Sequence, residues 1–232
     1  MLLLFFTIAG ILYYPSIRIA QRCMKYRKPF HLKTPMLIWN MFMAIMSGIG
    51  AFYTVPYLSN AFLEWEGDRV YCDYPTIINN EQIYYIIQVF CYTKIVEWID
   101  TVFLILRKRR VIFLHWFHHL ATYTYCLYAV YNPDMYASGL WFTAMNLFVH
   151  AVMYTYYAFA TIGYKLRLNV LITFLQTAQM FVGVYVALKM RQCSEVNQVG
   201  FYLCIAMYSF YVYLFSKLLM TKCSKLIKVK IT

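Results

Sequence analysis

The chain has 232 residues, of which 62% are hydrophobic, 20% aromatic and 13% charged. A soluble domain has about 45–50% apolar and 25% charged residues, so this composition excludes an ordinary soluble protein and predicts an integral membrane protein. The net charge is +12, but the basic residues lie in short clusters between apolar runs. This distribution is typical of cytosolic membrane loops and argues against nucleic-acid binding. No polar block is long enough for a second domain, so we expect one domain over residues 1–232.

A transmembrane helix needs about 20 largely apolar residues. Seven stretches meet this need and predict an all-α fold of seven transmembrane helices. They run over about 1–19, 36–58, 83–106, 111–131, 138–160, 169–189 and 197–219. The first could be a signal peptide, but it lacks a basic n-region and a clean small-residue cleavage site, so we favour a helix.

The loops between these stretches alternate in charge. Most basic residues fall in clusters at 18–33, 107–110, 164–167 and 217–230. Most acidic residues fall in the opposite loops, so the positive-inside rule predicts a lumenal or extracellular N-terminus and a cytosolic C-terminus. Cys72 and Cys193 then share the oxidising side. We expect a disulfide between them, with two free thiols as the alternative.

The third predicted span carries Lys94, Glu97 and Asp100 among apolar residues. Ionisable groups within the membrane are costly and normally face a site or a pathway. Lys94 and Glu97 can pair at a spacing of three residues, and Asp100 could orient a histidine imidazole. The alternative is an ion-pair network that only positions helices.

Three histidines, His115, His118 and His119, share one face of the fourth predicted span, directly after the basic cluster. A lone histidine in a membrane is often a packing residue, but three on one face indicate a functional site. We expect His31, in a basic loop, to be solvated.

The fifth span carries Asn146 and His150 on one stripe, and both can donate and accept hydrogen bonds within the membrane. We therefore assign them to the site. The same helix carries side chains that either line the site or pack on neighbouring helices, namely Met153, Tyr154, Tyr156 and Tyr157. In the sixth span, Gln176 and Gln179 could join helices or line a polar cavity, and both alternatives stay open.

Four motifs together resemble one family. KIVEWIDT, HWFHH, NLFVHAVMYTYY and LQTAQ match in order and spacing the KxxExxDT, HxxHH, NxxxHxxMYxYY and QxxQ boxes of the ELO family of very-long-chain fatty acid elongases. The resemblance covers residues from about 26 to 222. The segments VHAVMY and TAQM are more similar to the branch that elongates saturated and monounsaturated chains. The departures are a short N-terminal region and Phe117 where Tyr is common.

The resemblance implies that six of the seven helices form an inverted barrel around a narrow acyl tunnel. It implies the condensation of an acyl-CoA with malonyl-CoA to 3-oxoacyl-CoA, CO2 and CoA in the endoplasmic reticulum membrane. The two thioesters are substrates, and no cofactor or metal is expected. The reductases and the dehydratase of the elongation cycle are the implied partners, and a homo-oligomer is left open.

The resemblance also suggests His118 as the acyl acceptor, with His150 facing it across the tunnel. A neutral imidazole is a competent nucleophile, and no cysteine stands in a polar constellation. We expect His115 and His119 to orient His118 or to move protons, and Asn146 to stabilise negative charge. The remaining residues that we assign to catalysis are Lys94, Glu97 and Asp100, and those that we assign to substrate binding are Tyr154, Tyr157, Gln176 and Gln179.

Basic residues on the cytosolic side could hold the coenzyme phosphates or simply anchor the protein at the membrane surface. The candidates are Lys165, Arg167 and Lys222. Lys228 and Lys230, third and fifth from the end, resemble a dilysine signal for retrieval to the endoplasmic reticulum, and a basic surface tail is the alternative.

Two rival interpretations remain. Membrane di-iron desaturases also use HxxHH boxes, but they are built from about eight histidines in several boxes, whereas four lie in the predicted spans of this chain. The second rival is a seven-helix transporter or receptor, in which the same charged residues would form a proton or ligand path.

Overall fold

The computed structural model describes residues 2–164, 168–194 and 196–231, with side chains for 3–164, 168–194 and 196–225, and within these residues every regular element is a helix. The long helices are α1 (Leu2–Met24), α2 (Lys33–Glu64), α5 (Glu81–Thr93), α7 (Phe113–Val130), α8 (Tyr136–Ile162), α9 (Asn169–Met190) and α10 (Gln198–Ile231). The short elements are α3 (Arg69–Cys72), α4 (Tyr74–Asn79), η1 (Val96–Trp98), α6 (Ile99–Leu106) and η2 (Pro133–Met135).

The protein is a multi-pass membrane protein. Among the described residues, α1, α2, α9 and α10 are long and apolar enough to cross a bilayer. Large apolar side chains such as Phe52 and Leu63 face outward, at 72% and 80% exposure, as expected of a surface in contact with lipid. Helices α7 and α8 form where spans were predicted, but they carry many His, Thr and Tyr residues that lower their mean hydropathy.

The helix predicted over 83–106 is not continuous. The chain there forms α5, the 3₁₀ turn η1 and α6 in succession. At the break, the amides of Lys94 and Trp98 bond to carbonyls three residues earlier, Cys91 at 3.4 Å and Ile95 at 3.2 Å. Lys94 follows the last residue of α5 and Glu97 lies within η1, and their side chains meet across the break.

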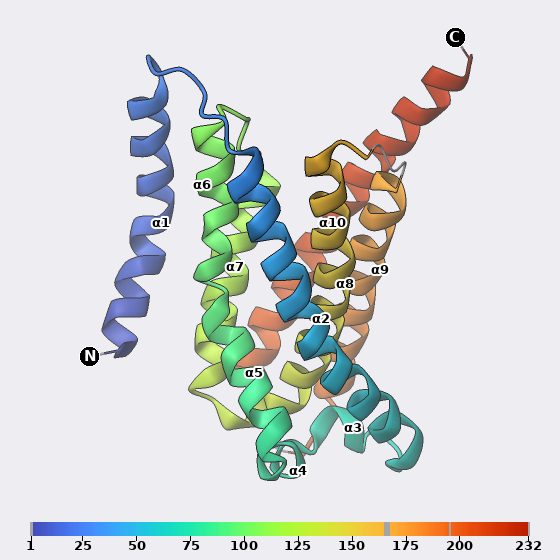
Figure 1. Ribbon diagram of the computed structural model, residues 1–232. Helices are drawn as coiled ribbons and strands as arrows, with labels where there is room; N and C mark the ends of the chain where they lie inside the picture. The colour runs from blue at the N-terminus through green and yellow to red at the C-terminus, as the bar shows by residue number, and fades with distance from the viewer. Residues whose placement is uncertain (1, 165–167, 195, 232) are drawn as a thin grey trace.

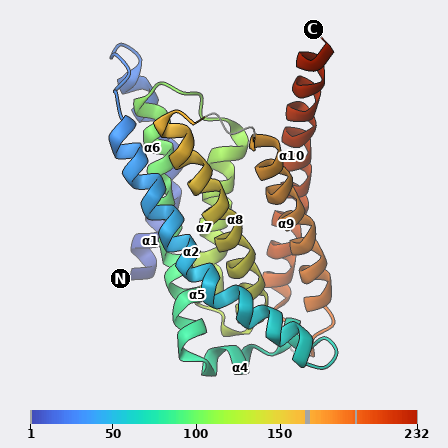
Figure 2. The ribbon, with the colours of Figure 1, turned by 45° about the vertical axis from the view of Figure 1, so that its right-hand side comes forward.

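The long helices pack side by side in a sequence that differs from their order in the chain (Figure 1). Helix α2 lies along α8, α8 along α9, α9 along α10, and α10 along α7, which in turn contacts α5. Helix α1 contacts α6 and α7 at the edge of the bundle, and α10 extends beyond the other helices at its C-terminal end (Figure 2). The buried polar residues of the motifs therefore lie between α5–α6, α7 and α8.

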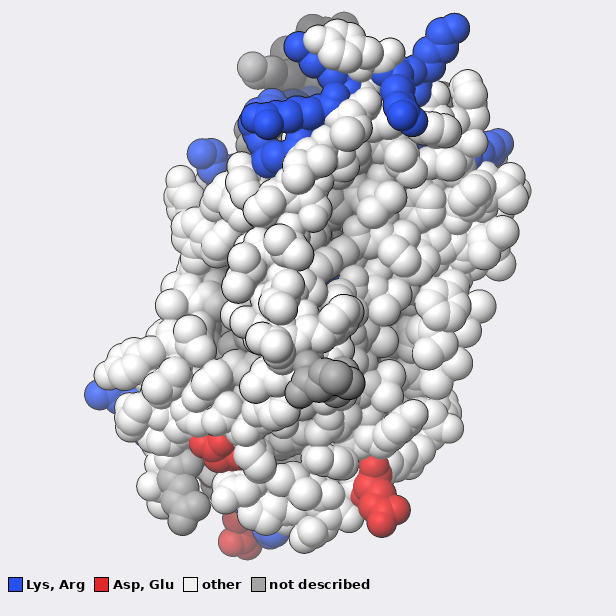
Figure 3. Space-filling model, turned by 90° about the vertical axis from the view of Figure 1, so that its left-hand side faces the viewer, with Lys and Arg blue, Asp and Glu red and all other residues white. Residues whose placement is uncertain are grey.

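The two ends of the bundle differ in charge. Lys and Arg gather at the end that holds the α1–α2 and α6–α7 loops, whereas Asp and Glu appear at the opposite end (Figure 3). This is the segregation that the sequence indicated.

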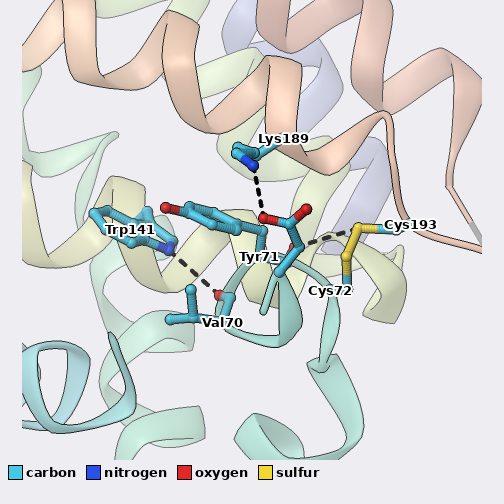
Figure 4. The surroundings of a disulfide bond; sticks show 7 residues. Val70, Tyr71, Cys72, Trp141, Lys189 and Cys193 are labelled. Carbon is cyan, nitrogen blue, oxygen red and sulfur yellow. Dashed lines mark hydrogen bonds and ion pairs between the residues drawn. A yellow bond between two sulfur atoms is a disulfide. The ribbon is translucent and has the colours of Figure 1, made fainter. Parts of the chain in front are cut away.

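A disulfide joins α3 to the segment after α9 at the acidic end (Figure 4). It links Cys72 to Cys193, whose Cα atoms are 5.5 Å apart. Beside it, the Lys189 amine donates to Asp68 Oδ1 at 2.8 Å, and the Trp141 indole donates to the Val70 carbonyl. These contacts hold the α3 region against α8 and α9 at the acidic end of the bundle.

Asp73 caps the N-terminus of α4. Its carboxylate accepts from the backbone amide of Thr76 at 3.0 Å and from Arg69 Nε at 2.6 Å. Burial raises the pKa of Asp73, but the hydrogen bonds from Thr76 and Arg69 outweigh burial and hold it below its usual value.

Candidate functional site

A cavity of about 1120 Å³ opens at the basic end of the bundle and reaches the histidines of α7 and α8. Its mouth is lined by cationic and polar side chains of the loops and of α10, namely His31, Lys33, Arg107, Lys108, Arg109, Arg110 and Lys222. His31 is exposed there, as the sequence suggested, but its place at the cavity mouth was not foreseen. The cavity therefore joins a cationic entrance to a buried polar floor.

The floor is built from the three histidines of α7. The imidazole rings of His115 and His119 are 4.6 Å apart between centroids, and those of His118 and His119 are 5.6 Å apart. His115 Nε2 lies 2.9 Å from the hydroxyl of Thr101, which in turn lies 2.8 Å from the Tyr13 hydroxyl. Thr101 and Tyr13 thus hold His115, so that His118 and His119 are the imidazoles left to face a substrate.

A buried ion pair lies next to the histidines. The Lys94 amine donates to Glu97 Oε1 at 2.5 Å and to Asn146 Oδ1 at 3.0 Å, and it stands 3.9 Å from the centroid of the Phe90 ring. His150 Nδ1 lies 3.6 Å from the same Glu97 oxygen. The predicted pairing of Lys94 with Glu97 is therefore present, and it connects the α5–α6 break to two polar residues of α8.

Asp100 does not orient a histidine, and that prediction is wrong. Its carboxylate accepts from the Trp39 indole at 2.6 Å and from the Tyr154 hydroxyl at 2.5 Å. Asp100 lies in the first turn of α6, and its partners belong to α2 and α8 rather than to α7. Asp100 therefore ties three helices together at the cavity wall, where Tyr154 lies edge-on to the His150 ring at 5.5 Å.

A second, much smaller pocket of about 10 Å³ lies on the other side of His118. Its walls come from α7, α8, α9 and α10 and consist of His118, Phe142, Met145, Asn146, Gln179, Met180, Tyr208 and Tyr211. Among the residues whose side chains are described, His118 is the one that lines both cavities. The Tyr211 hydroxyl donates to the His118 backbone carbonyl at 3.1 Å, so the tyrosine fixes the backbone at this junction.

The remaining predicted binding residues divide between the two cavities. Tyr154, Tyr157 and Gln176 line the large one, and the Gln176 amide donates to Met153 Sδ at 3.2 Å. Gln179 lines the small one, and its Oε1 is buried with no hydrogen-bond partner in the described part of the chain. Both glutamines therefore lie at cavity walls.

The predicted phosphate contacts have different outcomes. Lys222 lines the cavity, where its amine donates to Thr173 Oγ1 at 2.6 Å. Lys165 and Arg167 lie outside the described residues, as do the side chains of Lys228 and Lys230.

Several cavity residues were missed from the sequence. Trp39 and Asn40 of α2 belong to an otherwise apolar run, and Tyr208 and Tyr211 of α10 carry no motif. Their polar atoms within predicted spans are the signal that could have drawn attention to them, because buried polar groups need partners. Within the described part of the chain, no three His, Cys, Asp or Glu side chains are grouped so that they could hold a metal ion.

The fold and the site together define a class of protein. It is a multi-pass helical membrane protein with a cavity whose cationic entrance leads to buried imidazoles beside a Lys–Glu pair. Residues 2–228 match the model of the GNS1/SUR4 family, also called ELO. The chain belongs to this family.

"Fatty acid elongase 3" of Trypanosoma brucei brucei is 32% identical, over 91% of this chain and 81% of its own length. "Very long chain fatty acid elongase 3" of Homo sapiens is 36% identical, over 77% and 66% respectively. "Very long chain fatty acid elongase 6" of Gallus gallus is 37% identical, over 69% and 60% respectively.

Proposed function

We propose that the protein is the condensing enzyme of a fatty acid elongation cycle. As a member of its family it is a fatty acid elongase, an acyltransferase that uses acyl-CoA and malonyl-CoA. The assignment of His118 as the acyl acceptor rests on its position between the cationic cavity and the small internal pocket. A thioester that enters head-outward from the basic end would meet this imidazole where the coenzyme ends and the fatty chain begins.

The first half of the reaction transfers the acyl group. The neutral imidazole of His118 attacks the thioester carbonyl, a C–N bond forms and the C–S bond breaks. The proton lost from the imidazole goes to the departing CoA thiolate, and His150 and His119 are placed to pass it on. The enzyme then holds an acyl-imidazole, and free CoA leaves through the basic mouth.

The second half makes the new carbon–carbon bond. Malonyl-CoA loses CO2, and the electron pair of the broken bond forms an enolate that attacks the acyl carbon. The C–N bond to His118 breaks, and the imidazole takes back a proton. Lys94 and Asn146 lie near enough to the histidines to stabilise negative charge on the enolate or on the thioester oxygen. Glu97 pairs with Lys94, so that neither charge is buried alone.

The entrance suits the coenzyme. CoA carries several phosphate charges, and the cavity mouth gathers Lys33, Arg107 to Arg110 and Lys222. We assign the binding of these phosphates to this rim, with Lys165 and Arg167 as further candidates. The apolar walls deeper in, including Trp39, Phe103 and Tyr157, suit the pantetheine arm.

The membrane arrangement completes the proposal. We place seven spans in the bilayer, with the broken α5–α6 segment as the third and six of them enclosing the acyl tunnel. The protein lies in the endoplasmic reticulum membrane with its basic end facing the cytosol, so the N-terminus and the Cys72–Cys193 disulfide are lumenal. Lys228 and Lys230 act as the retrieval signal. The reductases and the dehydratase of the cycle are the expected partners, and the branch is the one for saturated and monounsaturated chains.

Intact-mass analysis tests the central step. The purified protein is mixed with stearoyl-CoA alone, and an acyl adduct is expected on the wild type and on Tyr202→Ala, which changes an exposed side chain of α10. His118→Ala should show no adduct while retaining its thermal stability. An adduct that persists in His118→Ala would move the nucleophile to another residue. Incorporation of radiolabelled malonyl-CoA, followed in parallel, tests the complete condensation.

A further inference from the structure

The pocket beyond His118 is far smaller than the cavity before it. About 1120 Å³ lies on the side of the basic mouth, and about 10 Å³ lies on the opposite side. Most of the side chains around the narrow part are apolar, and they include Phe142, Met145, Met180 and Tyr208. An acyl chain that is bound to His118 and points away from its coenzyme must pass these four side chains.

Tyr208 has little room to move away from the small pocket. It is 4% exposed, and its ring lies directly against the backbone of Gly183 on α9. A Cβ atom at Gly183 would stand 2.1 Å from Cε1 and 2.4 Å from Cζ of that ring. The tyrosine therefore already occupies the space that a side chain at 183 would need, and it cannot retreat further toward α9.

The neighbours of Tyr208 differ in stiffness. The Phe142 ring meets it edge to face at 6.1 Å and 85°, so a second aromatic ring limits its movement toward α8. Met145 and Met180 have unbranched, flexible side chains that can change rotamer as a chain enters. The passage can thus widen on the methionine side, while the wall formed by Tyr208 stays fixed.

We propose that Tyr208, held in place by Gly183, selects acyl chains that are straight close to the thioester. This inference rests on the proposed function. A saturated segment can take an extended conformation and slide past a fixed ring. A cis double bond near the carboxyl end forms a rigid bend at the ring and is rejected. A cis bond further along the chain crosses the narrow part only during loading, when the methionine side can widen, and in the bound state it lies beyond the ring and is tolerated. Tyr208 is therefore a specificity-determining residue for saturated chains and for chains unsaturated far from the thioester.

Three thioesters of equal chain length test this proposal. Stearoyl-CoA is saturated, petroselinoyl-CoA has its single cis bond near the thioester, and oleoyl-CoA has it further away. The measured quantity is kcat/KM for condensation with radiolabelled malonyl-CoA by purified full-length protein. For the wild type we expect a preference of at least about 10-fold for stearoyl-CoA over petroselinoyl-CoA, the scale on which one misplaced methylene is rejected by an apolar pocket. Oleoyl-CoA should stay within about threefold of stearoyl-CoA, because its bend lies past the ring.

Two variants change the wall in opposite directions. Tyr208→Met replaces the fixed ring by a flexible chain and should reduce the stearoyl/petroselinoyl preference to within about threefold. Gly183→Ala forces the ring away from α9 and should lower the rates with all three thioesters, most of all with petroselinoyl-CoA. Tyr208→Phe keeps the ring and should keep the preference. Tyr202→Met makes the same substitution at an exposed tyrosine of α10, 62% exposed, and should behave as the wild type.

The outcomes separate the two proposals. Equal wild-type rates with stearoyl-CoA and petroselinoyl-CoA overturn the selection by Tyr208, even where the variants fail to fold. An unchanged preference in folded Tyr208→Met overturns it as well. Absence of condensation with all three thioesters overturns the proposed function together with this inference.

Discussion

The Lys94–Glu97 pair allows a quantitative test of how the site is held together. Both side chains are buried, at 2% and 4% exposure, and their amine and carboxylate are 2.5 Å apart. Lys94→Met removes the amine and leaves the Glu97 carboxylate buried without its cation. Breaking a buried ion pair in this way costs about 3–5 kcal/mol. For a chain of this length that corresponds to a melting temperature lower by about 6–20 °C.

The double variant gives the decisive comparison. Lys94→Met together with Glu97→Met removes both charges and keeps two unbranched side chains of similar length. Replacing a buried ion pair by apolar residues is often neutral, so the double variant should be more stable than either single variant. It should also lack condensation activity, because no amine remains beside the histidines.

The assay is thermal unfolding in detergent, followed by tryptophan fluorescence, with condensation activity measured on the same preparations. Lys189→Met serves as the control. Its amine also bonds a carboxylate, that of Asp68 at 2.8 Å, but the two side chains are 28% and 38% exposed. An exposed pair of this kind contributes little to stability, because solvent screens its charges. A double variant whose destabilisation equals the sum of the single effects would refute the coupling, and a Lys189→Met loss as large as that of Lys94→Met would refute the role of burial.

Three further predictions concern regions outside the pair. Cys72→Ser should lower the melting temperature under oxidising conditions, since the disulfide closes a loop of 121 residues, worth up to about 5 kcal/mol, while Cys23→Ser at an exposed free thiol should not. Because the folded pKa of Asp73 is lowered, its contribution is present above the unfolded value of about 3.9 and is lost as the pH falls through the folded pKa. The protection of the α4 amides against hydrogen exchange, relative to their intrinsic rates at each pH, should therefore fall in acid in the wild type and be low at both pH values in Asp73→Ala, which removes the capping side chain. Thr101→Val should cost about 1–3 kcal/mol by leaving His115 without its partner, yet the acyl adduct should still form.

The positions of the helices could be predicted from the sequence because apolar runs of membrane length leave few alternatives. The charge of the loops likewise indicated which loops share an end. The pairing of Cys72 with Cys193 followed from that arrangement, and the structure forms the bond between them. The histidines of α7 could be placed on one face from their spacing alone, since a helix repeats every 3.6 residues.

Contacts between helices far apart in the chain could not be predicted. Asp100 bonds Trp39 and Tyr154, and nothing in the spacing of a single span indicates which distant indole or hydroxyl will approach it. The wall behind His118 is a similar case. Tyr208 matters because it meets Gly183 on another helix, and neither residue belongs to a motif. Such pairs depend on how helices are packed, which periodicity does not specify.

The break between α5 and α6 shows how a local deviation shapes the site. In a regular α-helix, residues 94 and 97 lie near each other but are rotated by about 60° around the axis, because three residues fall short of a full turn. At the break, Lys94 lies just after α5 and Glu97 lies within η1, and the pair contacts Asn146 and His150 of α8. Asp100, in the first turn of α6, bonds Trp39 and Tyr154 instead of a histidine. The interrupted helix therefore places an ion pair beside the His150 imidazole, in a stretch of chain where the sequence predicted one regular span.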